Sequence, residues 1–146
     1  MRICFDTNVI VDIMGKTADF PNSYAAYDTT LMREFDPCIS LTSLPDIVYL
    51  LKQRGFLDKE SARASLADLF TMFEVLDAKY VDCKEAYESA MSDFEDALIA
   101  FIARRNKVDF IVTRNKKDFL ASPVPALTPQ EFLETFCPPE ITYSML

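Results

Sequence analysis

The sequence contains no histidine and no tryptophan, and it has only two glycines, Gly15 and Gly55, among its 146 residues. Without histidine, Ser-His-Asp triads, Cys-His dyads and histidine-ligated zinc sites are excluded. Two isolated glycines cannot make the glycine-rich loops that hold phosphate groups in nucleotide-binding proteins. Any chemistry therefore has to be sought among the other side chains.

Closely spaced cysteine pairs and long apolar runs are also absent. The four cysteines, Cys4, Cys38, Cys83 and Cys137, form no Cys-x-x-C pair, so we interpret them as reduced thiols, buried where they fall in apolar runs. No apolar run approaches the roughly 18 residues that a membrane span needs, and the first residues turn acidic too early for a signal peptide. We expect a soluble, cytoplasmic protein without membrane contact.

Positive charge is scarce overall, with 15 basic and 23 acidic residues and a net charge of −8. A protein of this charge does not bind nucleic acid or anionic membranes through its bulk field, so any nucleic-acid site must be local. The exception is the segment 104–117, which has six basic residues against the single acid Asp109. This basic strip is either a solvated helix end or a surface for a phosphate backbone.

The apolar pattern predicts one α/β domain. Half of the residues are hydrophobic, which is enough for a core, and helical spacing separates the short β-branched runs. This alternation predicts a three-layer α/β/α sandwich with a mostly parallel central sheet of about five strands. We assign residues 1–136 to the domain and 137–146 to a C-terminal tail. The predicted strands are Arg2–Phe5, Cys38–Leu41, Phe73–Leu76, Phe110–Thr113 and Val124–Leu127.

Capping signals locate several of the predicted helices. One helix runs over Ser43–Gly55 and ends at glycine, and another begins after Asp58 and continues to about Met72. Three pairs have the spacing of a capping box, in which a polar cap and a residue three positions later satisfy each other's backbone. These pairs are Asp82 with Glu85, Ser92 with Glu95, and Thr128 with Glu131.

Acidic residues follow the predicted strands, where ligand sites form in open parallel sheets. Asp6 comes directly after the first strand, Asp46 lies early in the helix after the second, Asp93 and Asp96 open a later helix, and Asp118 follows the fourth strand. Each except Asp96 has a plain structural explanation as a helix cap, a first-turn acid or a loop acid. Asp96 adjoins the apolar segment 97–103, where a carboxylate needs a partner or a cation.

Together these acids indicate a metal site. If they lie about 6 Å apart, each ionised pair repels by about 3 kcal/mol at an effective dielectric constant of about 20. A divalent cation removes this repulsion, as does a proton held by one acid. Oxygen ligands without histidine or thiolate select Mg²⁺ or Mn²⁺, and such sites support phosphodiester hydrolysis.

Five segments, in this order, resemble the PIN-domain ribonucleases, in particular the VapC-type toxins of bacterial toxin–antitoxin pairs. They cover about residues 1–136, and no single one of them is specific. They are Ile3-Cys4-Phe5-Asp6-Thr7-Asn8, Ser43-Leu44-Pro45-Asp46-Ile47, Asp93-Phe94-Glu95-Asp96-Ala97-Leu98, Ile111-Val112-Thr113-Arg114-Asn115-Lys116-Lys117-Asp118-Phe119 and Leu127-Thr128-Pro129-Gln130-Glu131-Phe132-Leu133.

The resemblance implies Mg²⁺- or Mn²⁺-dependent cleavage of single-stranded or structured RNA by a homodimer that a small antitoxin inhibits. By this resemblance Asp6, Asp46, Asp96 and Asp118 are the catalytic acids, and Asp6, Asp96, Asp118 and Asp93 hold the metal. Asn8, Thr113 and Asn115 support these acids or lie beside the scissile phosphate. From the basic strip we expect five residues to bind RNA, namely Arg104, Arg105, Arg114, Lys116 and Lys117.

Two departures from the family pattern affect the predicted metal site. Asp46 stands where the family often has a glutamate, and Asn115 stands where it often has the fourth acid, which leaves Asp118 to substitute. An incomplete cluster would give the alternative function, a catalytically weak or inactive PIN-like module that binds RNA or protein. A second alternative is a phosphatase with Asp6 as a covalent nucleophile, although Asn8 replaces the second aspartate that such enzymes prefer.

Overall fold

The computed structural model describes residues 1–143, and its centre is a five-stranded sheet in which every pair of neighbours is parallel. The strand order is β3-β2-β1-β4-β5. The strands are β1 (Arg2–Phe5), β2 (Asp36–Ser40), β3 (Glu74–Leu76), β4 (Phe110–Val112) and β5 (Ala126–Leu127). The predicted α/β sandwich with about five mostly parallel strands is confirmed.

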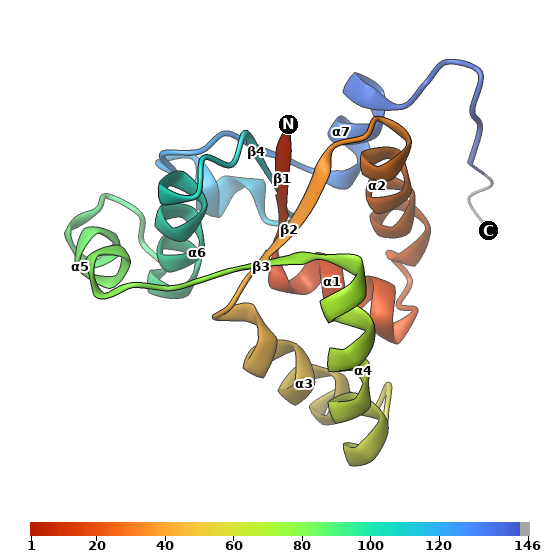
Figure 1. The fold of residues 1–146 in the computed structure, drawn as a ribbon, viewed down its shortest axis with the longest axis horizontal. Helices are drawn as coiled ribbons and strands as arrows, with labels where there is room; N and C mark the ends of the chain where they lie inside the picture. Colours follow the sequence, from red (N-terminus) through yellow and green to blue (C-terminus); the bar gives the residue numbers. More distant parts are fainter. Residues whose placement is uncertain (144–146) are drawn as a thin grey trace.

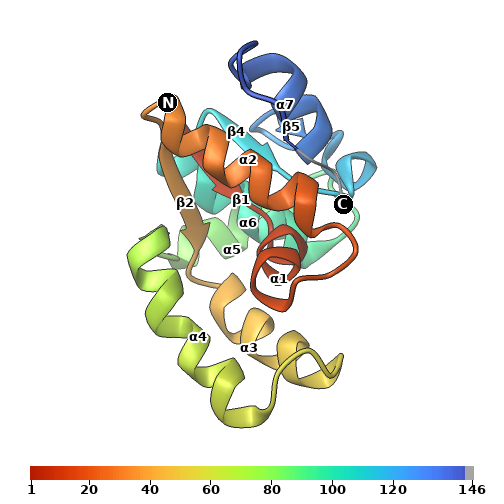
Figure 2. The same cartoon turned by 90° about the vertical axis from the view of Figure 1, so that its right-hand side faces the viewer.

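Helices cover both faces of this sheet. They are α1 (Thr7–Gly15), α2 (Phe20–Met32), α3 (Ser43–Gln53), α4 (Lys59–Met72), α5 (Tyr80–Glu88), α6 (Phe94–Arg105) and α7 (Pro129–Phe136), with a 3₁₀ turn, η1, at Lys116–Phe119. Figure 1 shows α5 and α6 on one side of the strands and α1, α2 and α7 on the other. Figure 2 shows that α3 and α4 lie together at one end of the molecule.

Alternating side chains of the strands divide the core in two. Ile3 and Phe5 of β1 pack in the larger cluster with residues of α1, α2, α3, α4 and α7. Cys4, between them, packs in the second cluster with residues of α5 and α6. This alternation is the period of a strand whose two faces are both covered, and it gives the three layers.

The strand order places a topological switch point between β1 and β4. From β1 the chain adds β2 and then β3 on one side of the sheet, and it later returns to add β4 and β5 on the other side. The register pairs Phe5 of β1 with Val112 of β4, so Asp6 and Thr113 lie beside each other just beyond the strands. In open α/β sheets such a crevice is where ligands bind.

Two of the three predicted capping boxes are wrong. Asp93, not Ser92, is the N-cap of α6, and its Oδ1 accepts the backbone N–H of Asp96 at 2.9 Å. α5 begins at Tyr80, so Asp82 lies inside its first turn and accepts the N–H of Lys79. Both stretches contain several acids, and spacing alone did not identify the one that caps.

The helix predicted over Ser43–Gly55 ends earlier, at Gln53, with Arg54 as its C-cap and Gly55 just beyond it at a φ of 75°. The signals for α4 and α7 are confirmed. Thr128 and Glu131 form the predicted capping box at α7, and Asp58 caps α4 through the N–H of Ser61. Cys4 and Cys38 are buried, and the four cysteines are free. Within residues 1–143, no helix combines the length and the apolar character that crossing a membrane requires.

The predicted tail is described up to residue 143, and residues 144–146 of it lie outside the described part of the chain. Tyr143 Oη donates a hydrogen bond of 2.7 Å to Asp28 Oδ2 in α2. This contact brings the end of the described chain against the same face of the sheet as α7.

Candidate functional site

Asp6 forms the base of the candidate site. It is the N-cap of α1, directly after β1, and only 3% of its surface is exposed. One carboxylate oxygen accepts the N–H of Thr7 at 2.8 Å, and the other accepts the hydroxyl of Thr113 at 2.8 Å. Thr113 in turn accepts the N–H of Asn115 at 3.0 Å. The ends of β1 and β4 are thereby joined through this carboxylate, which keeps lone pairs free on both oxygens.

A cavity of about 330 Å³ opens next to Asp6, between the N-terminal parts of α1 and α6 and one face of α3 along its length. Asp46 of α3 and Asp96 of α6 face it from two sides, and Asn8 of α1 also lines it. The complete lining is Asp6, Thr7, Asn8, Thr42, Asp46, Tyr49, Leu50, Arg54, Glu95, Asp96, Leu98 and Ile99. Three of the four acids expected to be catalytic therefore share one cavity.

Negative charge accumulates around Asp96. Its pKa is raised to about 7 because burial disfavours the charged form and because the carboxylates of Asp6, Asp93 and Asp118 repel it. Burial also raises the pKa of Asp6, although the hydrogen bonds from Thr113 and Thr7 oppose this effect. Asp96 is thus a carboxylate whose charge the surrounding protein does not neutralise.

The donor set fits a hard divalent cation. Asp6, Asp93, Asp96 and Asp118 come from three separate segments, supply only oxygen ligands, and interact electrostatically at Asp96. Over residues 1–143, however, no three acidic or thiol side chains lie close enough together to hold an ion as they stand. Cation binding at this site therefore needs the carboxylates to rotate towards one another.

The remaining predicted residues lie beside the cavity rather than on its wall. Asp118 belongs to η1, where its N–H donates to the carbonyl of Asn115 at 2.9 Å. Asp93 is exposed and caps α6. Thr113 is fully buried against Asp6. Asp118 and Asp93 lie near enough to raise the pKa of Asp96. The hydroxyl of Thr113 and the N–H of Asn115 form a chain of hydrogen bonds that ends at Asp6.

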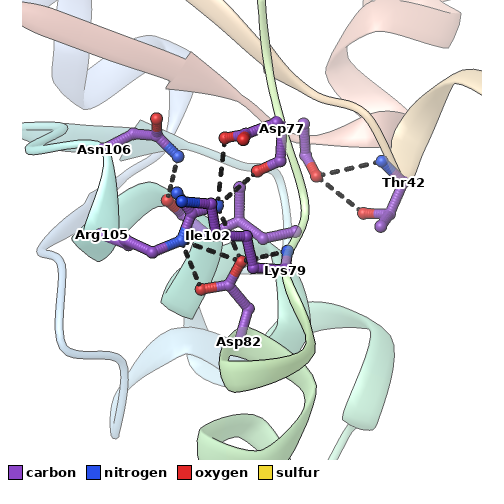
Figure 3. Close-up of polar contacts among 8 residues, drawn as sticks. Thr42, Asp77, Lys79, Asp82, Ile102, Arg105 and Asn106 are labelled. Carbon is purple, nitrogen blue, oxygen red and sulfur yellow. Dashed lines mark hydrogen bonds and ion pairs between the residues drawn. The ribbon is translucent and has the colours of Figure 1, made fainter.

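The basic strip is not a continuous cationic surface, because three of its residues are paired within the protein. Arg105 contacts the buried carboxylate of Asp82 and also Asp77, which Figure 3 shows on either side of the guanidinium. Arg114 Nε lies 2.8 Å from Asp12, which is 1% exposed.

The third pair joins Lys116 Nζ to Glu131 at 2.8 Å. Arg104 lies over the ring of Phe101, and Lys117 is exposed. Of the five residues expected to bind RNA, Arg104 and Lys117 are those for which residues 1–143 show no ion pair.

Sequence reasoning missed the wall of the cavity that α3 provides. Tyr49, Leu50 and Arg54 line it together with Asp46. These residues lie three, four and eight positions after Asp46, the spacing of one helix face. That spacing is visible in the sequence, but a tyrosine, a leucine and an arginine on one helix face do not by themselves indicate a ligand site.

Comparison with known proteins identifies the family. The sequence profile of the PIN domain matches residues 2–117. The comparison with curated proteins gives no match. A match over this much of the chain leaves the covalent phosphatase without support.

Solved structures with a similar fold include the following three. A chain of VapBC2 from Rickettsia felis, bound to a DNA fragment from the promoter, is 22% identical, with a TM-score of 0.69 and coverage of 88% of this chain and 98% of that one. FitAcB from Neisseria gonorrhoeae is 18% identical, with a TM-score of 0.67 and coverage of 88% and 98%. DNA-bound VapBC from Salmonella typhimurium is 20% identical, with a TM-score of 0.65 and the same coverage. At these identities the likeness shows the fold.

Proposed function

The chain belongs to the PIN domain family, and from this premise we propose that it is a Mg²⁺- or Mn²⁺-dependent endoribonuclease and the toxin of a toxin–antitoxin pair. The observation that carries the proposal is the group of carboxylates from three segments that interacts electrostatically with Asp96, beside a cavity at the switch point of the sheet. Such an excess of negative charge is what a divalent cation neutralises.

Asp6, Asp96, Asp118 and Asp93 hold the cation in this proposal, and Asp46 completes the acidic cavity from α3. Thr113 and the N–H of Thr7 fix the orientation of Asp6, since each donates to a different oxygen of its carboxylate. Asn8 lines the cavity with an amide that can donate to a phosphate oxygen. Asn115 acts through Thr113, because its N–H fixes the hydroxyl that Asp6 needs.

When bound, the cation supplies an activated water and stabilises the negative charge that develops on the phosphate oxygens. The protein needs no covalent intermediate, because water can attack the phosphodiester in line. Asp6 is accordingly a ligand and not a nucleophile in this proposal. Its two hydrogen bonds favour the charged form of the carboxylate, against the effect of burial, and fix its orientation.

The proposed toxin role is supported by what the similar structures are. Those from Rickettsia felis and Salmonella typhimurium are VapBC complexes, and one from Klebsiella pneumoniae is a toxin–antitoxin complex. We propose by analogy that a small antitoxin binds this chain, that the protein is a homodimer, and that it acts in the cytoplasm. A small neighbouring gene for a DNA-binding protein with an amphipathic tail would support the pairing.

One observation favours a second candidate, a PIN-like module that binds RNA or protein with little or no cleavage. Within the described chain, no three carboxylates stand ready to hold an ion, and Asn115 occupies the place of an expected acid. If the side chains do not rotate inward, the cation binds weakly and catalysis fails. RNA binding without cleavage at saturating Mn²⁺ would support this candidate.

The test is RNA cleavage by the full chain with Mg²⁺ or Mn²⁺ and with EDTA. We expect cleavage only with the cation, and at least about a hundredfold lower rates in Asp6→Asn and in Asp96→Asn, since each removes a charged ligand. Asp68→Asn is the matched control, because Asp68 is an exposed acid of α4 outside the cavity. Wild-type rates in both site variants would refute the assigned roles.

A further inference from the structure

The face of α3 that lines the acidic cavity carries groups that the metal site does not use. Asp46, Tyr49, Leu50 and Arg54 all line the cavity from this helix and the residue that ends it. Opposite them, α6 contributes Leu98 and Ile99 beyond its acids. The lining of the cavity therefore combines its acidic side chains with one aromatic ring, aliphatic side chains and a guanidinium.

Arg54 is the one basic residue among the described residues that line the cavity. It is exposed, and residues 1–143 provide it with no ion pair, in contrast to Arg105 and Arg114. An arginine beside several carboxylates that pairs with none of them keeps its planar set of donors available for a phosphate. A cation here would also offset the repulsion between the acids and the RNA backbone.

Tyr49 presents a large aromatic surface at the mouth of the same cavity. Its exposed fraction is 61%, so most of the ring is open to a ligand. Leu50 and Ile99 flank the cavity and exclude water from part of its wall. An exposed ring next to an aliphatic surface is a suitable platform for stacking a base.

The geometry points to a nucleotide subsite made by Tyr49 and Arg54, in which Tyr49 stacks on the base next to the scissile bond and Arg54 binds an adjoining phosphate. This inference rests on the proposed ribonuclease function and adds two residues that contact its RNA substrate. Stacking on Tyr49 needs an unpaired base, so the substrate is single-stranded RNA or a loop, and a base-paired helix is excluded. The subsite has no part in holding the cation.

The first test measures equilibrium binding of a fluorescein-labelled single-stranded oligoribonucleotide of mixed sequence to the full chain in EDTA, where the RNA stays intact. We expect Arg54→Ala to raise Kd about tenfold, as loss of a charge-assisted contact to phosphate does. The slope of log Kd against log salt concentration should fall by about 0.7, the contribution of one phosphate contact on a single strand. Lys52→Ala is the matched control, because Lys52 is an exposed cation of the same helix that does not line the cavity.

The second test separates stacking from the hydroxyl group. We expect Tyr49→Ala to weaken binding about fivefold to tenfold, within the range measured for base stacking on aromatic residues, and Tyr49→Phe to bind as the wild type does. Tyr87→Ala, at an exposed tyrosine of α5, is the control. A blunt RNA duplex should bind with equal affinity to the wild type and to Tyr49→Ala.

Cleavage by the same preparations in Mn²⁺ distinguishes the subsite from the nuclease function. If the wild type cleaves RNA while Arg54→Ala and Tyr49→Ala match its Kd and KM, the subsite is wrong and the nuclease function stands. If both variants lose affinity and no preparation cleaves, the subsite stands and the nuclease function fails. If Tyr49→Ala changes only the oligomeric state seen by light scattering, Tyr49 belongs to a protein interface and the subsite is wrong.

Discussion

Asp96 is an acidic residue whose surroundings in the folded protein disfavour its charged form. It lies in the first turn of α6, where the N–H groups favour a carboxylate, and its own N–H is capped by Asp93. Burial and the neighbouring acids nevertheless dominate and raise its pKa to about 7. Near neutral pH the free protein therefore loses part of its stability at this position.

The pH dependence of the free energy of unfolding should reveal the stability that is lost when Asp96 ionises. The pKa of Asp96 is about 3.8 in the unfolded chain and about 7 in the folded protein. Protonated Asp96 therefore contributes its full stabilisation below about pH 3.8, and this contribution is lost as the pH rises through about 7. In EDTA, Asp96→Asn should therefore become more stable than the wild type between about pH 4 and pH 8, by on the order of 1–2 kcal/mol once solvent screening is allowed for. Urea unfolding of both proteins across this range measures the difference.

The pKa of Asp82, which pairs with Arg105, is shifted in the opposite direction from that of Asp96. Burial opposes ionisation of Asp82, but the hydrogen bonds from Arg105 and from the N–H of Lys79 outweigh it and lower its pKa. Its contribution is therefore lost only as the pH falls below about 3.8, outside the window for Asp96. Equal pH profiles for the wild type and Asp96→Asn would contradict the charge excess.

At the scale of elements, α6 connects the acidic cavity to a second polar cluster at its other end. Its first turn carries Asp96, and its last turn carries Arg105, which holds Asp82 of α5 and the carbonyl of Asp77 after β3. Figure 3 shows this cluster around the Arg105 guanidinium. The helix that presents Asp96 is thus fixed at its C-terminal end by its pairing with α5.

Removing Arg105 should cost far more stability than removing its exposed partner. Asp82 is 2% exposed at its side chain, so Arg105→Ala leaves a buried carboxylate without its cation, whereas the side chain of Asp77 is 63% exposed. We expect Arg105→Ala to lower Tm by on the order of 5–10 °C and Asp77→Ala to lower it by about 2 °C or less. Thermal unfolding followed by circular dichroism compares them, and equal shifts would show that the Asp82 pair is not important for stability.

The same elements show what the sequence could and could not predict. Strands such as Arg2–Phe5 and helices such as α4 were predictable because their apolar period and caps are local. The convergence of Asp6 and Asp96 was also predictable. Asp6 follows a strand and Asp96 lies in the first turn of the helix before β4, and in a parallel sheet such a helix starts at the edge where the strands end.

Partners distant in sequence were not predictable. The basic strip was read as free charge, but Arg114 pairs with Asp12 and Arg105 with Asp82, across 102 and 23 positions of the chain. The strand order brings Arg114 and Asp12 together, and the packing of α5 against α6 brings Arg105 and Asp82 together. The contribution of Arg54 to the cavity was missed for a different reason, because an arginine at a helix end is ordinary until the opposite wall is known.

For the whole molecule, the acidic cluster joins segments that are remote along the chain. Asp6 follows the first strand, Asp96 opens α6, and Asp118 lies in η1. These segments come together only in the folded protein, so a cation that binds all three binds the native state and has little affinity for the unfolded chain. Such a ligand stabilises the entire fold by mass action.

Mn²⁺ should therefore raise the thermal stability of the wild type in a concentration-dependent way. At about 100 times the Kd the gain is about 2.7 kcal/mol, which for a domain of this size raises Tm by roughly 5–10 °C. Asp96→Asn should lose most of this gain because it removes a charged ligand, while Asp68→Asn, with an exposed acid on α4, should keep it. Differential scanning fluorimetry over a Mn²⁺ series, with EDTA as the starting point, measures all three proteins. An equal rise in Asp96→Asn and the wild type would place the cation elsewhere on the protein, and no rise in the wild type would mean that the carboxylates do not close around it.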